Sequence, residues 1–178
     1  YVVGAIEKAF KAYGFEPLET PAVELRSVLM GKYGEEAEKL IYDVQHVGGK
    51  EDLALRYDLT VPLTRVVAMN ADLRLPFKRY QIAPVWRAER PAKGRYRQFY
   101  QCDADIVGSA SMLADAEIVA LIRDILGRLA FPRYTIQINH RQVLMGLGQY
   151  CGVTGDLAGA LYRSLDKLTK IGEEGVMA

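Results

Sequence analysis

Most of the information in this sequence lies in residues 77–108, which read FKRYQIAPVWRAERPAKGRYRQFYQCDADIVG. Residues 75–88 and 96–107 have the apolar or alternating composition of strands, and the polar loop between them contains Pro91 and Gly94. A connection this short joins neighbouring antiparallel strands. The sequence therefore predicts an antiparallel pair of strands with a basic connecting loop.

Polar side chains gather on one face of the second strand. Because residues two apart in a strand point to the same side, this face holds Arg97, Phe99, Gln101, Asp103 and Asp105. It offers a cation for a phosphate, an aromatic ring that can stack on a purine, and carboxylates for an ammonium or imidazole group. A solvated sheet face with surface ion pairs is the alternative interpretation.

Positive charge is concentrated around the loop. Residues 74–97 contain eight basic residues and one acidic residue, Glu89, so the segment carries a net charge of +7, whereas the whole chain carries +1. Arg87, Arg90 and Arg95 come from a strand end and from the loop, and a planar guanidinium group matches two phosphate oxygens at once. A nearly neutral chain is not typical of a protein that coats nucleic acid. The local charge instead indicates a site for a compact polyanion such as a triphosphate.

A second candidate segment is 56–60, RYDLT, where a strand passes into a helix. Asp58 or Thr60 can cap the start of that helix, and capping alone explains both residues. A carboxylate and a hydroxyl at this place also suit a substrate ammonium group. The sequence has neither a P-loop nor a Rossmann glycine pattern. It shows no nucleophile with a neighbouring base, so it gives no support to covalent catalysis.

The order of elements predicts an α+β fold, an antiparallel sheet flanked by helices. Helices are expected at 1–13, 25–33, 35–40, 60–70 and 111–129, with further helices beginning at Gln142 and Asp156. Besides the central pair, strands are expected at 15–19, 40–47, 53–57 and 134–138, with a hairpin around Gly48, Gly49 and Lys50. With a boundary near 152–155, we expect a main domain over 1–151 and the start of a separate, inserted helical piece over 152–178.

Composition sets further limits on the class of protein. Half of the 178 residues are apolar, but no apolar run is long enough for a membrane span and no signal-peptide pattern opens the sequence. With no disulfide framework, a reducing cytoplasm is expected. The cysteines and histidines have no metal-ligand or redox spacing: Cys102, Cys151, His46 and His140. Since the first residue is Tyr1, we expect the chain to be a piece of a longer protein.

At this point the motifs resemble a known family. Residues 77–108 are similar to motif 2 of the histidyl-tRNA synthetases, the FRxERP–GRYRQF–Q–D/E series, with Trp86 where Phe is common. Residues 14–24 resemble motif 1, and 53–60, LALRYDLT, resemble the amino-acid-binding segment of archaeal-like and eukaryote-like members. The resemblance implies a class II aminoacyl-tRNA synthetase catalytic core with motif 1 at a homodimer interface. It also implies a histidine–tRNA ligase that uses ATP, Mg²⁺, histidine and tRNA(His) in protein biosynthesis.

The resemblance implies roles for four residues toward ATP. Arg87 would bind the α-phosphate and the attacking carboxylate, and is therefore the expected catalytic residue. Arg95 would hold the γ-phosphate end, and Glu89 would lie near the adenine and the metal-bound phosphates. Phe99 would stack on the adenine ring.

Four further residues would bind the amino acid. Asp58, Thr60 and Gln101 would receive the α-ammonium group of histidine, and Asp105 would contact the imidazole ring. These roles agree with the strand face predicted from the residues, and they favour substrate binding over capping for Asp58 and Thr60.

Three parts of the family pattern do not occur in these residues: an RGLDYY-like histidine-specific segment, motif 3 with its second ATP arginine, and the anticodon-binding domain. We therefore expect about half of an active site here. The alternative is a non-catalytic paralogue, such as the regulatory subunit of ATP phosphoribosyltransferase or a tRNA sensor domain. Such proteins lose motif 2 arginines or loop charges, which are retained here. A class II synthetase for another amino acid is a further alternative. The combination of Gln101 and Asp105 favours histidine over it.

Overall fold

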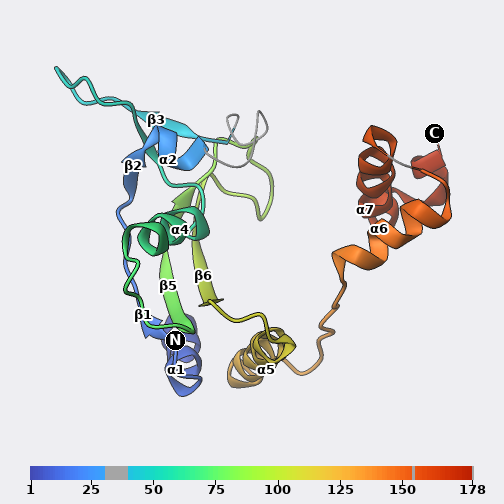
Figure 1. The fold of residues 1–178 in the computed structure, drawn as a ribbon, viewed down its shortest axis with the longest axis horizontal. Coiled ribbons are helices and arrows are strands. Elements are labelled where there is room, and N and C mark those ends of the chain that lie inside the picture. The colour runs from blue at the N-terminus through green and yellow to red at the C-terminus, as the bar shows by residue number, and fades with distance from the viewer. Residues whose placement is uncertain (31–39, 154, 178) are drawn as a thin grey trace. The chain divides into compact units, whose positions relative to one another are not determined.

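The computed structural model describes residues 1–30, 40–153 and 155–177 (Figure 1). The chain divides into two compact units, Tyr1–Tyr134 and Thr135–Ala178. The division expected at 151/152 lies inside the second unit, and the assignment of 152–178 to a helical insertion stays a prediction. The helix expected at 35–40 falls almost wholly outside the described residues.

A three-stranded sheet forms the centre of the first unit. Strands β5 (Phe77–Trp86) and β6 (Gln98–Val107) pair antiparallel over their full length, from Phe77 opposite Val107 to Trp86 opposite Gln98. This confirms the predicted pair. The third strand, β1 (Glu16–Pro17), is very short and runs parallel to β5, which the sequence did not predict.

One face of this sheet is covered by two helices, α1 (Val2–Ala12) and α5 (Met112–Arg128), which contact each other (Figure 1). Helix α1 turns its buried residues Ile6 and Phe10 toward the sheet because side chains four apart share one helix face. Leu121 of α5 completes the same apolar cluster, together with Tyr80 from β5. We call this side of β5 and β6 the core face.

The opposite face meets the start of α4 (Thr60–Met69). Leu59, which precedes the helix, is fully buried against Ala83 and Val85 of β5, and Phe99 of β6 packs against this cluster. Figure 1 shows α4 beside the two long strands. The side chains in the two clusters come from opposite sides of the strands, so α4 begins on the face opposite α1 and α5. The α+β arrangement predicted from the sequence is therefore confirmed.

A second small sheet follows the order β2-β4-β3 and is entirely antiparallel: β2 (Val23–Leu25), β4 (Leu53–Leu55), β3 (Tyr42–Val44). It packs with helix α2 (Arg26–Met30) around Leu29, Ala54 and Tyr57. The predicted hairpin between the last two strands is confirmed. Buried Arg56 links the two sheets, since its Nη1 donates to the carbonyl oxygen of Thr20 at 2.6 Å and its Nε to that of Pro84 at 3.0 Å.

The second unit contains helices α6 (Arg141–Tyr150) and α7 (Asp156–Met177). The helices approach closely where a Cβ at Gly148 would lie only 2.5 Å from the Tyr162 hydroxyl oxygen. The two predicted helices of this region are therefore confirmed, although α7 has a kink at Gly172, whose φ is +72°.

The strand expected at 134–138 is wrong, because this segment is irregular backbone. The alternation of Tyr134, Ile136 and Ile138 has the period of a strand, but no neighbouring strand pairs with it among the described residues. Ile138 is largely exposed, and the Tyr134 hydroxyl donates to the carbonyl oxygen of Arg123 in α5 at 3.4 Å. Periodicity without a pairing partner does not make a strand.

Candidate functional site

The face of β5 and β6 opposite the core face carries two rows of polar side chains. Residues directly opposite each other in an antiparallel pair lie on the same side of the sheet. The register therefore places four pairs on one side: Arg79 with Asp105, Gln81 with Asp103, Ala83 with Gln101, and Val85 with Phe99. We call this side the site face. The β6 row agrees with the alternation predicted from the sequence, and β5 adds Arg79 and Gln81 to it.

Arg79 is the largest fully buried side chain of the described chain. Its Nη2 donates to the carbonyl oxygen of Leu59 at 2.9 Å and lies 2.7 Å from Oδ2 of Asp105. The second contact is close but lacks the alignment of a hydrogen bond, so it is an ion pair. Burial lowers the pKa of Arg79, and the nearby carboxylates, Asp105 first, act in the opposite direction.

Three carboxyl groups surround this guanidinium: Asp58, Asp103 and Asp105. Burial raises the pKa of each from the ordinary value of an aspartate, because low solvation disfavours the charged form. Arg79 lowers the pKa of all three, but to a smaller extent than burial raises it. A bound cation would offset the same desolvation, so this end of the site face suits a positively charged ligand.

The start of α4 lies against the same end. Asp58 Oδ1 accepts a hydrogen bond from the backbone N–H of Val61 at 3.1 Å, so the capping interpretation holds for this residue. That bond uses one of the two carboxylate oxygens. Asp58 also borders the site face, near Arg79, Arg87 and Asp105, and capping and ligand binding are therefore compatible for it. Thr60 is the first residue of the helix and lies at the exposed start of α4.

Gln101 stands between the carboxylates and the aromatic end. Its Oε1 is buried and has no hydrogen-bond partner among the described residues. An unpaired buried acceptor costs free energy, on the order of 1–3 kcal/mol. A ligand that donates a hydrogen bond here would remove that cost, as an ammonium group does.

At the other end, Arg87 and Phe99 are in contact. The guanidinium carbon of Arg87 lies 5.0 Å from the centroid of the Phe99 ring, within the range of a cation–π interaction. The Nε of Arg87 donates to the carbonyl oxygen of Tyr57 at 3.1 Å, and its backbone N–H donates to the carbonyl oxygen of Arg97 at 2.8 Å. Arg87 is therefore fixed at the junction of the sheet, the loop and the segment before α4.

The loop after β5 carries the remaining predicted phosphate ligands. Arg95 Nε lies 2.8 Å from Glu89 Oε2, and Arg97 Nε donates to the Glu89 carbonyl oxygen at 3.3 Å. Gly94, with φ of +77°, forms the turn between Ala92 and Arg95. The side chain of Arg95 is 65% exposed, so its ion pair with Glu89 is weak. A phosphate could therefore replace Glu89 as the partner of Arg95.

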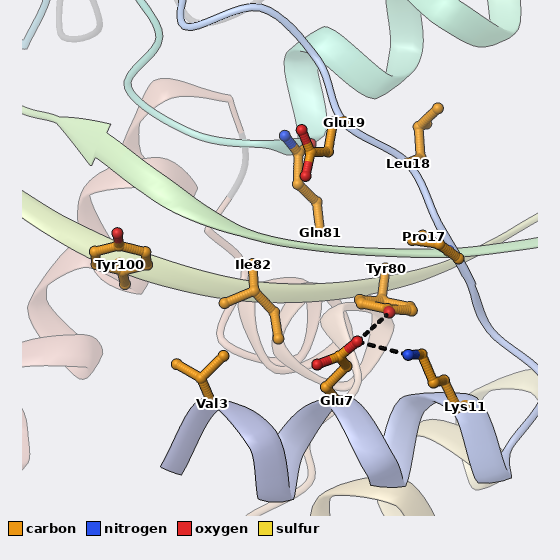
Figure 2. Close-up of a pocket in the computed structure, with 10 residues that line it drawn as sticks. All are labelled: Val3, Glu7, Lys11, Pro17, Leu18, Glu19, Tyr80, Gln81, Ile82 and Tyr100. Carbon is orange, nitrogen blue, oxygen red and sulfur yellow. Dashed lines mark hydrogen bonds and ion pairs between the residues drawn. The ribbon is translucent and has the colours of Figure 1, made fainter. Parts of the chain in front are cut away.

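A distinct recess lies at the edge of the core face, between α1, β1 and β5 (Figure 2). It has a volume of about 330 Å³, and Tyr80, Ile82 and Tyr100 form part of its wall. In Figure 2 Glu7 lies between Lys11 and Tyr80: its Oε1 is 2.6 Å from Lys11 Nζ and accepts from the Tyr80 hydroxyl at 3.3 Å. None of the predicted site residues lines this recess.

The described residues contain no group of three or more histidine, cysteine, aspartate or glutamate side chains arranged to hold a metal ion. Among the same residues, no helix combines the length and the apolar character that crossing a bilayer requires.

The sequence analysis placed Asp103 among the carboxylates of this face but missed Arg79 and Gln81. Arg79 was only one of eight basic residues in a charged segment. The signal for both was available in the alternation of β5, where Arg79 and Gln81 are polar residues two apart. Aligning the two strands about their loop sets Arg79 opposite Asp105 and Gln81 opposite Asp103.

Comparisons with known proteins identify the family of the chain. Residues 2–172 match the family described as Histidyl-tRNA synthetase. The chain is 52% identical to the histidine–tRNA ligase of Aeropyrum pernix over 98% of its own length and 40% of that protein. For the histidine–tRNA ligase of Gloeobacter violaceus the identity is 47%, over 99% of this chain and 43% of the relative. The crystal structure of histidyl-tRNA synthetase from Nostoc sp. PCC 7120 superposes with a TM-score of 0.84 at 37% identity, covering 99% of this chain and 39% of that one.

Proposed function

Since the chain belongs to the histidyl-tRNA synthetase family, we propose that it forms part of the active site of a class II histidine–tRNA ligase. The chain spans about 40% of the length of the curated relatives named above. The activity, substrates and partners of the whole protein are therefore part of this proposal. The observation that carries it is the site face, where an arginine, an aromatic ring, an amide and carboxylates follow one another along one strand pair.

The proposed reaction has two steps. A carboxylate oxygen of histidine attacks the α-phosphorus of ATP, the bond from that phosphorus to the bridging oxygen breaks, and pyrophosphate leaves. A hydroxyl of the terminal ribose of tRNA(His) then attacks the carbonyl carbon of the histidyl-adenylate, and AMP leaves. In such a reaction the protein supplies orientation and charge neutralisation, and no covalent enzyme intermediate is needed.

Arg87 is the proposed catalytic residue. Its contacts with Tyr57 and Phe99 hold the guanidinium at one place on the site face. A fixed cation there would neutralise the charge that develops on the α-phosphate and would orient the attacking carboxylate. Phe99 would stack on adenine, and Arg95 with Glu89 would lie toward the γ-phosphate and its metal. These roles fit the order of the residues along the strand and loop.

The carboxylate end would bind histidine. Asp58, Thr60 and Gln101 would receive the α-ammonium group, for which the unpaired Oε1 of Gln101 is a suitable acceptor. Asp105 would accept a hydrogen bond from the imidazole ring. The raised pKa of the buried carboxyls favours this use, because a cationic or hydrogen-bond-donating ligand stabilises their charged form.

Glu89 would hold the Mg²⁺ that accompanies ATP, because it supplies a carboxylate beside the loop arginine Arg95. When bound, the ion would supply neutralisation of the phosphate charge. Arg95 would hold the terminal phosphate.

We also propose that the whole protein is a cytoplasmic homodimer, with α1 and the segment that follows it at the subunit interface. Exposed Val2 and Val3 on α1 support an interface there. A non-catalytic paralogue is the rival function. The retained arginines and carboxylates of the site face favour the enzyme, because a binding domain without adenylation has no need for all of them.

The test is amino-acid-dependent exchange of pyrophosphate into ATP by the whole protein. We expect exchange with histidine and none above background with the other standard amino acids. A folded protein that binds tRNA or another partner but shows no exchange with any amino acid would favour the paralogue instead.

A further inference from the structure

Arg79 connects the two sides of the proposed amino-acid pocket. Its Nη2 donates to the carbonyl oxygen of Leu59 at 2.9 Å and forms an ion pair with Asp105 at 2.7 Å. Leu59 lies between Asp58 and Thr60 at the start of α4, whereas Asp105 belongs to β6. One guanidinium group therefore fixes both segments that would contact the substrate.

The environment of Arg79 is unusual for an arginine. The side chain is fully buried, and its Nε and Nη1 have no hydrogen-bond partner among the described residues. A buried cation is costly unless it is paired, and its unpaired donors add to that cost. The charge of Arg79 offsets part of the desolvation of the neighbouring carboxylates, since it lowers the pKa of Asp58, Asp103 and Asp105.

We propose that Arg79 is a positioning residue for the amino acid: it sets the separation of the α4 start and Asp105, and it keeps Asp105 ionised so that this carboxylate accepts the imidazole N–H. The inference rests on the proposed function and adds a residue to it. Arg79 itself does not contact the reacting atoms and acts through Asp105 and the backbone at Leu59.

Several charged groups lie near Asp105. Burial raises the pKa of Asp105, and Arg79 is the group that lowers it. Asp58 and Asp103 belong to the same cluster of buried carboxyls, with Arg87 near both. Asp115 of α5 and Asp105 line a separate hollow between β6 and α5. Removing the charge of Arg79 would therefore raise the pKa of Asp105 further. As the pH falls, Asp105 would then be protonated at a higher pH than in the unmodified protein, and binding that needs the ionised carboxylate would be lost at that higher pH.

The experiment compares Arg79→Gln and Arg79→Lys in the whole protein by histidine-dependent pyrophosphate exchange as a function of pH. For Arg79→Gln we expect the KM for histidine to rise about tenfold or more, as for a lost charge-assisted contact, with a smaller change for ATP. We also expect the acid limb of kcat/KM for histidine to move to higher pH. Arg79→Lys keeps the charge, so the acid limb should return toward that of the unmodified protein while the KM stays raised.

Arg56→Gln is the matched control. Arg56 is also a buried arginine that donates to two backbone carbonyl oxygens, and burial likewise lowers its pKa, but it forms no ion pair with the site-face carboxylates. This substitution should lower the melting temperature without moving the acid limb. A second arm places Arg79→Gln in an Asp105→Asn background, where Arg79→Gln should no longer move the acid limb and its effect on the histidine KM should shrink to the part that acts through Leu59.

The outcomes separate the two proposals. An unmodified protein that shows no histidine-dependent exchange removes the proposed function. If the unmodified protein shows normal exchange, two results overturn the role of Arg79 alone. One is an acid limb that stays unchanged in Arg79→Gln, and the other is an equal loss of kcat/KM for histidine and for ATP in that variant. If Arg79→Gln does not fold, Arg79→Lys carries the test: a histidine KM equal to that of the unmodified protein would overturn the positioning role.

Discussion

The guanidinium group of Arg87 lies over the ring of Phe99, 5.0 Å from its centroid. The contact joins the end of β5 to the site face of β6, and the bond from Arg87 to the Tyr57 carbonyl oxygen fixes the same side chain from a third segment. Arg87, the residue proposed to bind the α-phosphate, is therefore held in place by the protein itself. Preorganisation of this kind is what transition-state stabilisation by a fixed cation requires.

Replacing this arginine should affect the chemical step more than binding. Arg87→Ala is expected to reduce histidine-dependent pyrophosphate exchange by a factor of about 10²–10³, equivalent to about 3–4 kcal/mol of transition-state stabilisation. Arg128→Ala removes an arginine from an exposed ion pair with Asp124 and should leave exchange within about twofold. Near-normal exchange in Arg87→Ala would contradict the catalytic role.

Asp105→Asn should impair the use of histidine more than the use of ATP. The substitution removes the proposed acceptor for the imidazole and the partner of Arg79, so the histidine KM should rise or kcat fall, while the ATP KM changes less. Asp43→Asn, at a surface ion pair with Arg26, is the control. Steady-state exchange kinetics with each substrate varied in turn distinguish the cases. Equal losses for both substrates would point to general disruption of the strand.

The buried carboxyls also predict a pH dependence of stability. Asp103 has a pKa above its ordinary value in the folded protein, mainly through burial, so its ionisation destabilises the fold at neutral pH. Asp103→Asn should therefore raise the melting temperature at pH 7. The gain should shrink as the pH falls through the raised pKa, and vanish below the ordinary value of 3.8, where both side chains are neutral. Calorimetry over this range tests the sign, and a lower melting temperature at pH 7 would refute it.

A cavity in the apolar cluster on the core face should lower the free energy of unfolding. Leu121 is almost completely buried between α5, α1 and the sheet, so Leu121→Ala should cost about 2–5 kcal/mol of unfolding free energy. Leu113→Ala, on the same helix but 78% exposed, should change it by less than about 0.5 kcal/mol. Denaturant titration of both variants measures the difference. Similar losses at the two positions would mean that α5 does not pack as described.

Assembly gives a further prediction for the whole protein. We expect a dimer at micromolar concentration in light scattering, with pyrophosphate exchange lost when the dimer is disrupted. Val3→Glu places a charge on the exposed apolar part of α1 and should favour the monomer. Lys8→Glu, another charge change on α1, is the comparison. A clean monomer with full exchange activity would remove α1 from the interface.

The sequence predicted the central strand pair well because its signals agreed with one another. All the signals pointed to the same arrangement: two long segments of strand composition, a loop with Pro91 and Gly94, and polar residues at alternate positions from Gln101 to Asp105. Helix α5 was equally easy to predict, because its apolar residues recur with a clear helical period. Ser111 caps it by accepting a hydrogen bond from the Leu113 N–H at 3.2 Å.

The features that escaped prediction depend on contacts between distant segments. The parallel pairing of β1 with β5 involves only two residues and has no local signal. The segment 134–138 alternates like a strand, yet pairing partners decide strands and periodicity alone does not. Arg79 belonged to a basic segment, and only the register against β6 shows that it is buried with Asp105 and separate from the exposed loop arginines.

The two faces of the β5–β6 pair have a consequence for how this part of the protein can vary. On both strands the odd-numbered residues 79–85 and 99–105 belong to the site face, and the even-numbered residues between them belong to the core face. A slip of one residue would move aspartates against Ile6 and Phe10 and would turn apolar side chains toward the substrate. Both the stability of the core and the proposed site therefore depend on this register. Insertions between Arg87 and Arg97 leave that register intact, so drift in length during evolution should concentrate in this loop and spare the strands on either side.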